Sequence, residues 1–164
     1  MNLSAVQLRR SDLARSVGRT LRKTGLEVRR LSLDVTEPAY ISVLENKTAT
    51  LERLKQLGVR LAIDDFGVGY SSLSYLKRLP ADFLKIDRSF VKGLGEDVED
   101  TAIVSMVIDL AHVLGMKVVA EGVESTHLKE QLKELGCDLA QGFYFAQAQP
   151  AGDIEALLTS GSVG

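Results

Sequence analysis

Short apolar runs alternate with longer stretches of helical periodicity along most of this chain. The apolar runs predict strands over residues 29–35, 59–63, 82–86, 116–120 and 137–141. Apolar positions three or four residues apart predict helices over residues 11–23, 43–57, 98–114, 125–135 and 152–159, with a short helix near 71–77. Three of these helices are followed by a glycine, at Gly58, Gly115 and Gly136. Repeated strand–helix units of this kind predict an α/β fold with a parallel sheet.

Nearly every predicted strand ends in a side chain that carries a charge or an amide. The residues at or just past these ends are Asp34, Glu37, Asp64, Asp65, Lys85, Glu121, Glu124 and Gln141. In a parallel α/β barrel the carboxyl ends of the strands converge on one mouth, where the active site lies. Crowded carboxylates repel one another unless a cation neutralises them, and oxygen ligands favour Mg²⁺ or Mn²⁺ over Zn²⁺. Two such ions about 4 Å apart suit phosphodiester hydrolysis, because they stabilise both the attacking and the leaving oxygens.

Most of these positions also have a purely structural interpretation. A single aspartate at a strand end more often caps a helix or shapes a turn, so Asp65 could serve only its glycine-rich loop. Glu124 could be a favourable charge at a helix N-terminus, and we favour helix capping as the role of Asp87. Lys85 is harder to explain this way, because a lysine inside an apolar strand is costly to bury without partners.

Composition narrows the classes of protein that need to be considered. The chain has 164 residues, 45% of them hydrophobic and 26% charged, which fits one globular domain. A net charge of -2 gives no electrostatic reason to expect binding to polymeric nucleic acid or to a membrane. Cys137 is the only cysteine, which excludes an intrachain disulfide, and we expect a cytoplasmic location. His112 and His127 lie within predicted helices, and the serines of YSSLS have no nearby histidine–aspartate arrangement, so a nucleophilic hydrolase is disfavoured.

Five sequence blocks carry a family resemblance and follow one another along the chain: MNLSAVQL, DVTE, AIDDFGVGYSSLSYLKRLPADFLKIDRSFV, VVAEGVES and ELGCDLAQGFYFA. These blocks resemble those of EAL domains, which hydrolyse cyclic di-GMP to the linear dinucleotide pGpG in bacterial signalling. The resemblance implies a TIM-barrel-like (β/α) fold with a two-metal Mg²⁺ or Mn²⁺ site. The metal ligands that it implies are Asn2, Asp34, Asp64, Asp65 and Glu121. It further implies that Lys85 and Glu121 act in catalysis, with support from Glu37, Glu124 and Gln141.

The chain departs from the family pattern in ways that bear on activity. The E-A-L segment that names the family is absent, and Asp34 stands where the family usually has glutamate. Val68 replaces the usual threonine or alanine, and AQAQP replaces the usual pattern before Pro150. A complete TIM barrel has about 250 residues. We therefore expect an incomplete barrel that lacks the first strands, and a misplaced start, a deliberate fragment and a natural truncation are all open.

These departures leave three functional hypotheses. The chain is a phosphodiesterase domain that is weak or inactive in this form, a degenerate receptor that binds cyclic di-GMP without cleaving it, or an oligomerisation module. An open barrel of five strong strands would leave two exposed edges and uncovered apolar lining. We expect self-association through that opening, with residues 1–10 and 160–164 as candidates for disorder within a single domain spanning residues 1–164.

Overall fold

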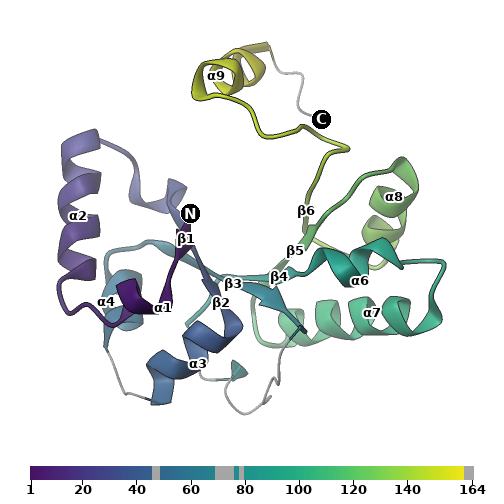
Figure 1. The fold of residues 1–164 in the computed structure, drawn as a ribbon, viewed down its shortest axis with the longest axis horizontal. Coiled ribbons are helices and arrows are strands. Elements are labelled where there is room, and N and C mark those ends of the chain that lie inside the picture. Colours follow the sequence, from purple (N-terminus) through teal and green to yellow (C-terminus); the bar gives the residue numbers. More distant parts are fainter. Residues whose placement is uncertain (46–48, 69–75, 78–79, 161–164) are drawn as a thin grey trace.

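One parallel sheet forms the centre of the molecule in a computed structural model that describes residues 1–45, 49–68, 76–77 and 80–160 (Figure 1). Its strands follow one another in chain order from β1 to β6, every neighbouring pair being parallel. The strands are β1 (Asn2–Leu3), β2 (Ser32–Thr36), β3 (Arg60–Phe66), β4 (Phe83–Ile86), β5 (Lys117–Glu121) and β6 (Leu139–Gln141). The parallel α/β fold is confirmed. Because β1 and β6 are the two edges of the described sheet, the barrel is open.

The helices lie on the outside of this sheet, except for the last one (Ala151–Ser160), which lies apart from the sheet (Figure 1). They are α1 (Ala5–Leu8), α2 (Leu13–Thr24), α3 (Glu37–Glu45), α4 (Thr50–Gln56), α6 (Arg88–Lys92), α7 (Val98–Val113), α8 (Thr126–Glu134) and α9 (Ala151–Ser160). A short 3₁₀ helix, η1 (Val28–Arg30), precedes β2. Gly25 ends α2 in the left-handed region, with φ 69°, a conformation that glycine adopts without steric cost.

Two of the predicted helices and strands need correction, and a third prediction falls mostly on residues that the structure does not describe. The single helix predicted over 43–57 is wrong, because α3 begins at Glu37 directly after β2 and α4 is a separate helix. Pro38 is tolerated there, since the first turn of a helix needs no backbone donor at that position. The strand predicted from residue 29 begins only at Ser32. The short helix predicted near 71–77 falls mostly on residues outside the described part of the chain.

The N-terminal segment adds one strand, β1, to the five strong strands that the sequence predicted. Asn2 and Leu3 pair with Asp34 and Val35, so the described sheet has six strands. The segment 1–10 contains both β1 and α1, and Ser4 caps α1 by accepting a hydrogen bond from the Gln7 amide. Disorder of residues 1–10 in solution stays a prediction.

The core lies between the outer face of the sheet and its helices. Successive side chains of a strand point to opposite faces. Leu33 and Val35 of β2, Leu61 and Ile63 of β3, and Leu84 and Ile86 of β4 are all fully buried. The alternate positions, Asp34, Ala62 and Lys85 among them, therefore face the inside of the open barrel.

The buried hydroxyl of Tyr40 in α3 allows the packing of this core to be tested by mutation. Its side chain is fully buried, and its hydroxyl has no hydrogen-bond partner among the described residues. Burial raises its pKa, and the charge of Asp82 raises it further, so the hydroxyl stays neutral. Tyr40→Phe should leave the free energy of unfolding unchanged or raise it by about 1 kcal/mol, since a buried hydroxyl without a partner costs stability. Urea unfolding would measure this, with Tyr144→Phe at a partly exposed site as the control. A loss of stability in Tyr40→Phe would contradict the assignment.

Candidate active site

A β-bulge at the end of β3 directs two consecutive carboxylates toward one site. Ile63 pairs with Leu84 and Phe66 with Ile86, so three steps along β3 match two along β4. Consecutive residues in a regular strand point to opposite faces, and a bulge is the usual way to redirect one of them. Asp65 has φ 54°, and it is the one non-glycine residue with positive φ in the described chain. Aspartate tolerates this left-handed conformation better than most residues.

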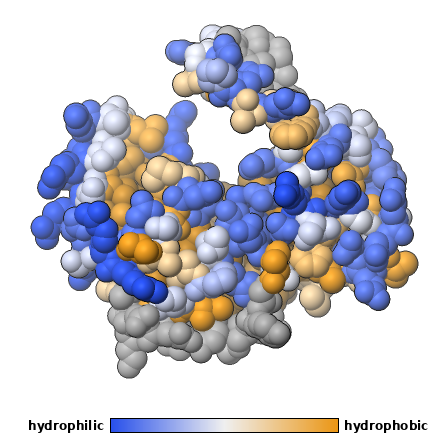
Figure 2. Space-filling view, in the orientation of Figure 1, coloured by the Kyte–Doolittle hydropathy of each residue, from blue (hydrophilic) through white to orange (hydrophobic). Residues whose placement is uncertain are grey.

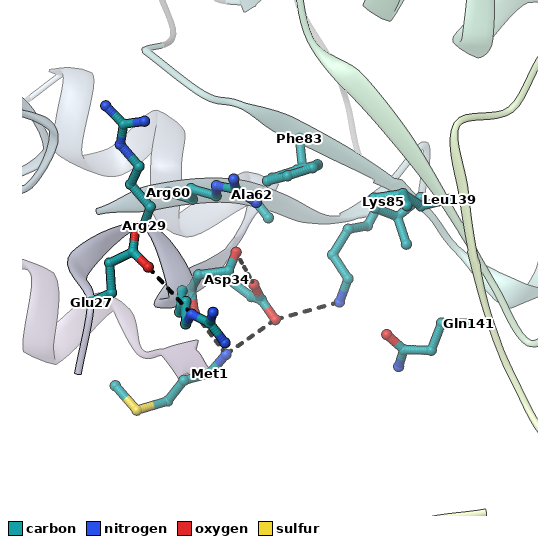
Figure 3. A pocket seen from close by; sticks show the side chains of 13 residues that line it. Met1, Glu27, Arg29, Asp34, Arg60, Ala62, Phe83, Lys85, Leu139 and Gln141 are labelled. Atoms are coloured by element: carbon teal, nitrogen blue, oxygen red, sulfur yellow. Dashed lines mark hydrogen bonds and ion pairs between the residues drawn. The ribbon is translucent and has the colours of Figure 1, made fainter. Parts of the chain in front are cut away.

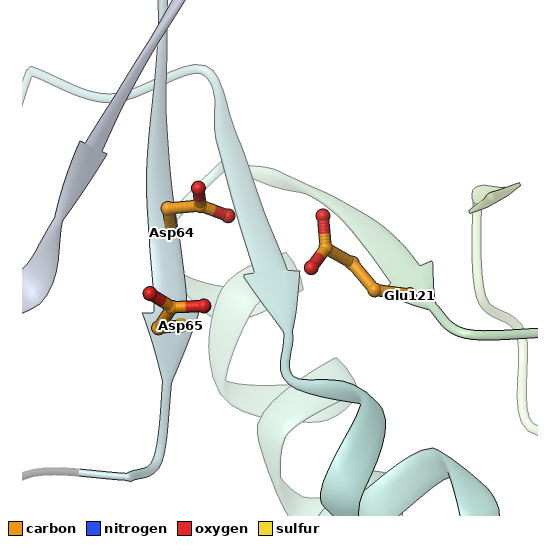
Figure 4. A group of neighbouring side chains, drawn as sticks. All are labelled: Asp64, Asp65 and Glu121. Carbon is orange, nitrogen blue, oxygen red and sulfur yellow. The ribbon is translucent and has the colours of Figure 1, made fainter. Parts of the chain in front are cut away.

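Three carboxylates from two strands form a compact group at the mouth of the sheet (Figure 4). One carboxylate oxygen each from Asp64, Asp65 and Glu121 lies within 4.8 Å of the other two. Asp64 and Asp65 come from the end of β3, and Glu121 from the end of β5. Because these are hard oxygen donors without sulfur or imidazole, the group suits Mg²⁺ or Mn²⁺. The sequence prediction that these three side chains meet agrees with this geometry.

Lys85 of β4 lies among these carboxylates. Its ammonium nitrogen is 2.7 Å from Asp64 Oδ1, 2.5 Å from Glu121 Oε1 and 3.6 Å from Asp34 Oδ2. Burial opposes protonation of the amine, but the hydrogen bonds to Asp64 and Glu121 outweigh it and raise its pKa above the ordinary value. The lysine is therefore a fixed positive charge, which explains how it is buried inside an apolar strand.

The side of the site built from β1 and β2 is arranged differently. Asp34 accepts a hydrogen bond from the Ser32 hydroxyl at 3.4 Å and lies 3.5 Å from the N-terminal amine of Met1. Asp34 lies outside the compact carboxylate group, with Lys85 as its contact to the site. Asn2 is exposed and pairs through its backbone with Asp34.

The three residues predicted to support the site lie around it at different depths. Glu37 is buried at the start of α3, whereas Glu124 is exposed between β5 and α8. Gln141 ends β6 beside Glu121 and accepts a hydrogen bond from the Val123 amide through its backbone carbonyl. The glycine-rich loop 66–72, which follows Asp65, lies outside the described residues from position 69 onward.

A cavity of about 780 Å³ opens inside the barrel next to these residues (Figure 3). Its walls include Asp34, Lys85 and Gln141. Arg60 also lines it, with its guanidinium carbon 5.8 Å from the centre of the Phe83 ring, an arrangement typical of a cation–π contact. The sequence prediction missed both residues, although Arg60, Ala62 and Asp64 alternate along one strand and so share a face.

Asp87 caps a helix, and its charge also raises the pKa of Asp65, which the sequence did not predict. It caps α6 by accepting a hydrogen bond from the Ser89 amide at 2.9 Å, which confirms the capping interpretation. Desolvation raises the pKa of Asp65, and the negative charges of Asp64 and Asp87 raise it further, while Lys85 lowers it. A divalent cation at this group would relieve that repulsion, so the donor set fits such an ion.

Asp65 combines strained backbone with an unfavourable charge, and two substitutions separate these effects. Because its folded pKa is raised, the ionised carboxylate lowers stability at pH 7 when no divalent cation is bound. Asp65→Asn should raise the urea midpoint at pH 7 without metal, and this gain should shrink as the pH falls and vanish below about pH 3, where Asp65 is protonated in both the folded and the unfolded state. Asp65→Ala should be less stable than Asp65→Asn by about 1 kcal/mol, because alanine tolerates positive φ less well. Equal stability of the two variants would contradict this account of the bulge.

Comparisons with known proteins agree with this geometry. The sequence model of the EAL domain matches residues 1–148. The chain belongs to the EAL domain family.

Two relatives illustrate how closely this EAL domain matches characterised members. It is 46% identical over 160 residues to the bifunctional diguanylate cyclase/cyclic di-GMP phosphodiesterase MucR of Pseudomonas aeruginosa, covering 98% of this chain and 23% of MucR. The solved PaMucR phosphodiesterase–c-di-GMP complex superposes with a TM-score of 0.87 at 46% identity, covering 93% of this chain and 68% of that one. The EAL domain of Mycobacterium smegmatis DcpA gives a TM-score of 0.92 at 42% identity, covering 99% and 73%.

A third relative was solved with a metal. Klebsiella pneumoniae BlrP1, in its manganese/cy-diGMP complex, matches with a TM-score of 0.82 at 34% identity, covering 90% of this EAL domain and 38% of that chain. The present chain spans about a fifth of the length of MucR, so MucR has a large additional part. Among the described residues, no helix is both long enough and apolar enough to cross a bilayer.

Proposed function

We propose that this EAL domain is a metal-dependent phosphodiesterase module that acts on cyclic di-GMP and yields linear pGpG. The observation that carries the proposal is the compact group of Asp64, Asp65 and Glu121 with Lys85 in contact with two of them. The relatives named as cyclic di-GMP phosphodiesterases or solved with that ligand support the choice of substrate.

Each residue of the group has a role that follows from its position. Asp64, Asp65 and Glu121 would hold Mg²⁺ or Mn²⁺, which when bound polarises the phosphodiester and activates water. Lys85, whose charge is fixed by its carboxylate partners, would orient the attacking water and stabilise negative charge that develops on the phosphate. Glu121 would additionally act as a general base. Gln141 and Glu124, at the rim of the mouth, would support the substrate.

Asn2 and Asp34 complete the proposed ligand set on the other side of the mouth. Asp34 has one methylene less than the glutamate usual in the family, and metal ligation tolerates errors of only a few tenths of an ångström. This shorter reach supports weak or no turnover by the chain. Glu37, buried at the start of α3, would steady the loop after Asp65.

One assay separates the functional hypotheses. The chain is incubated with cyclic di-GMP and Mg²⁺ or Mn²⁺, and both binding and linear product are measured. Metal-dependent product supports the phosphodiesterase, whereas tight binding without product in an otherwise well-folded chain favours the degenerate receptor. Absence of binding would contradict both and leave the oligomerisation module.

Self-association through the open side of the barrel is our proposal for the partner of this chain. An apolar groove of about 650 Å³ lies between α2 and the β1 edge, lined by Leu3, Leu13, Val17, Leu21, Leu26 and Leu31. In Figure 2 apolar atoms gather on this part of the surface, beside the hydrophilic outer side of α2. Light scattering after size exclusion should give a mass above one chain that rises with concentration. A stable monomer at high concentration would contradict this proposal.

We further propose that the domain acts in the cytoplasm without contact to a membrane.

A further inference from the structure

Two aspartates at the opposite end of the strands from the active site make the same set of contacts. Asp82, just before β4, accepts a hydrogen bond from the Leu61 amide of β3 at 2.8 Å. Both of its carboxylate oxygens lie 2.6 Å from the ammonium nitrogen of Lys55, which belongs to α4, the helix before β3. Its carboxylate therefore joins β4, β3 and α4, and we call this the Lys55 clamp.

The second aspartate repeats this arrangement two strands further along the sheet. Asp138, just before β6, accepts a hydrogen bond from the Val118 amide of β5 at 2.9 Å. The same oxygen lies 2.9 Å from Nε2 of His112, which belongs to α7, the helix before β5. This group, which we call the His112 clamp, differs from the Lys55 clamp mainly in having histidine in place of lysine.

The spacing between clamp and active site is the same in all four strands. Leu61 and Asp82 each precede a site residue by three positions, namely Asp64 and Lys85. Val118 and Asp138 likewise precede Glu121 and Gln141 by three positions. A slip of one residue between parallel strands would turn every side chain to the other face. Each clamp therefore fixes the register of one pair of neighbouring site residues from about 10 Å away.

We propose that Asp82 and Asp138 are positioning residues for the active site, and that His112 makes the position of Glu121 and Gln141 sensitive to pH. The proposal rests on the proposed function, because it assigns Glu121 to the metal site. Lysine stays charged throughout the physiological range, whereas histidine changes charge between about pH 5 and 8. A hydrogen bond between two charged groups is about twice as strong as a neutral one.

The charged and titratable groups around the His112 clamp are consistent with a single titrating partner. Burial raises the pKa of Asp138, but the Val118 amide, His112 and Lys117 lower it by more, so its carboxylate is ionised at neutral pH. Cys137 donates its thiol to the Leu139 carbonyl at 3.2 Å, and burial raises its pKa. Asp109 lies one turn earlier on α7. Histidine is the residue type in this clamp that ordinarily changes charge between about pH 5 and 8.

Replacing His112 by lysine, and Lys55 by histidine, tests the proposal on the full chain. Amide hydrogen exchange at Val118, corrected for the intrinsic rate, should lose about fivefold of its protection between pH 6 and 8. His112→Lys should abolish this loss, and Lys55→His should create the same loss at Leu61. If the protection of the Val118 amide from hydrogen exchange changes neither with pH nor with His112→Lys, the His112 clamp is contradicted.

Mn²⁺ affinity of the same proteins tests whether the clamp positions the site. The ratio of the Mn²⁺ affinity of His112→Lys to that of the wild type should be near one at pH 6 and about three at pH 8. A ratio that does not change with pH would mean that the clamp is only structural and would overturn the positioning role. If the wild type binds no Mn²⁺, the proposed function fails and the positioning role fails with it, while the exchange at Val118 still decides the clamp itself.

Discussion

Replacing Asp64 by alanine should abolish metal-dependent cleavage of cyclic di-GMP. Asp64 belongs to the compact carboxylate group and accepts a hydrogen bond from Lys85, so its loss removes a metal ligand and a partner of the lysine together. Metal ions supply several kcal/mol of transition-state stabilisation, which corresponds to a loss of about 10³-fold or more in turnover. Product formation measured by chromatography, compared between the wild type and Asp64→Ala, would show this.

Metal affinity gives a second measurement on Asp64→Ala that does not need turnover. Removal of residues that only support metal ligands costs about 10–100-fold in affinity, so loss of a ligand should weaken Mn²⁺ binding at least tenfold. Asp153→Ala on the exposed surface of α9 is the matched control and should retain wild-type affinity. Equal Mn²⁺ affinity of Asp64→Ala and the control would show that Asp64 is not a ligand.

Lys85→Met should have the largest effect on stability. The lysine side chain is 11% exposed and neutralises Asp64 and Glu121, whose side chains are 12% and 19% exposed. Removing one partner of a buried ion pair typically costs about 3–5 kcal/mol, because the remaining charges stay buried without compensation. Urea unfolding in the presence of a chelator should therefore show a loss of this size.

Added Mn²⁺ should reverse much of that loss, because the ion replaces the positive charge between the carboxylates. The stabilisation by Mn²⁺ should therefore be larger in Lys85→Met than in the wild type, although catalysis stays absent. Lys92→Met on α6, where the lysine is exposed, is the control and should change neither quantity. Destabilisation that Mn²⁺ does not relieve would contradict the shared location of the lysine and the metal.

Regular features of this fold could be predicted from sequence because they depend on local periodicity. The alternation of β3 and β4 placed Asp64 and Lys85 at strand ends, and their contact at 2.7 Å follows from parallel pairing. The start of α3 was missed because helix follows strand without an intervening loop signal, and β1 was underestimated because two residues carry no periodicity. Such short elements depend on pairing partners that lie far away in sequence.

The features that sequence could not give are those that depend on register. The bulge at Asp65 is set by how β3 pairs with β4, so the sequence placed Asp64 and Asp65 at one mouth without revealing the backbone geometry that lets consecutive aspartates share it. The two clamps were missed for the same reason, since the local sequence around Asp82 and Asp138 is that of ordinary strand-entry residues. These long-range contacts are what align the site.

The measurement that tests the central claim most directly is Mn²⁺-dependent binding of cyclic di-GMP, compared between the wild type and Asp64→Ala. Isothermal titration would be carried out with Mn²⁺ and with chelator, and linear pGpG would be quantified in the same samples. The account predicts binding by the wild type only with Mn²⁺, and its loss in Asp64→Ala. Binding that is equal with and without Mn²⁺, or equal in the two proteins, would contradict a metal site built on Asp64, Asp65 and Glu121.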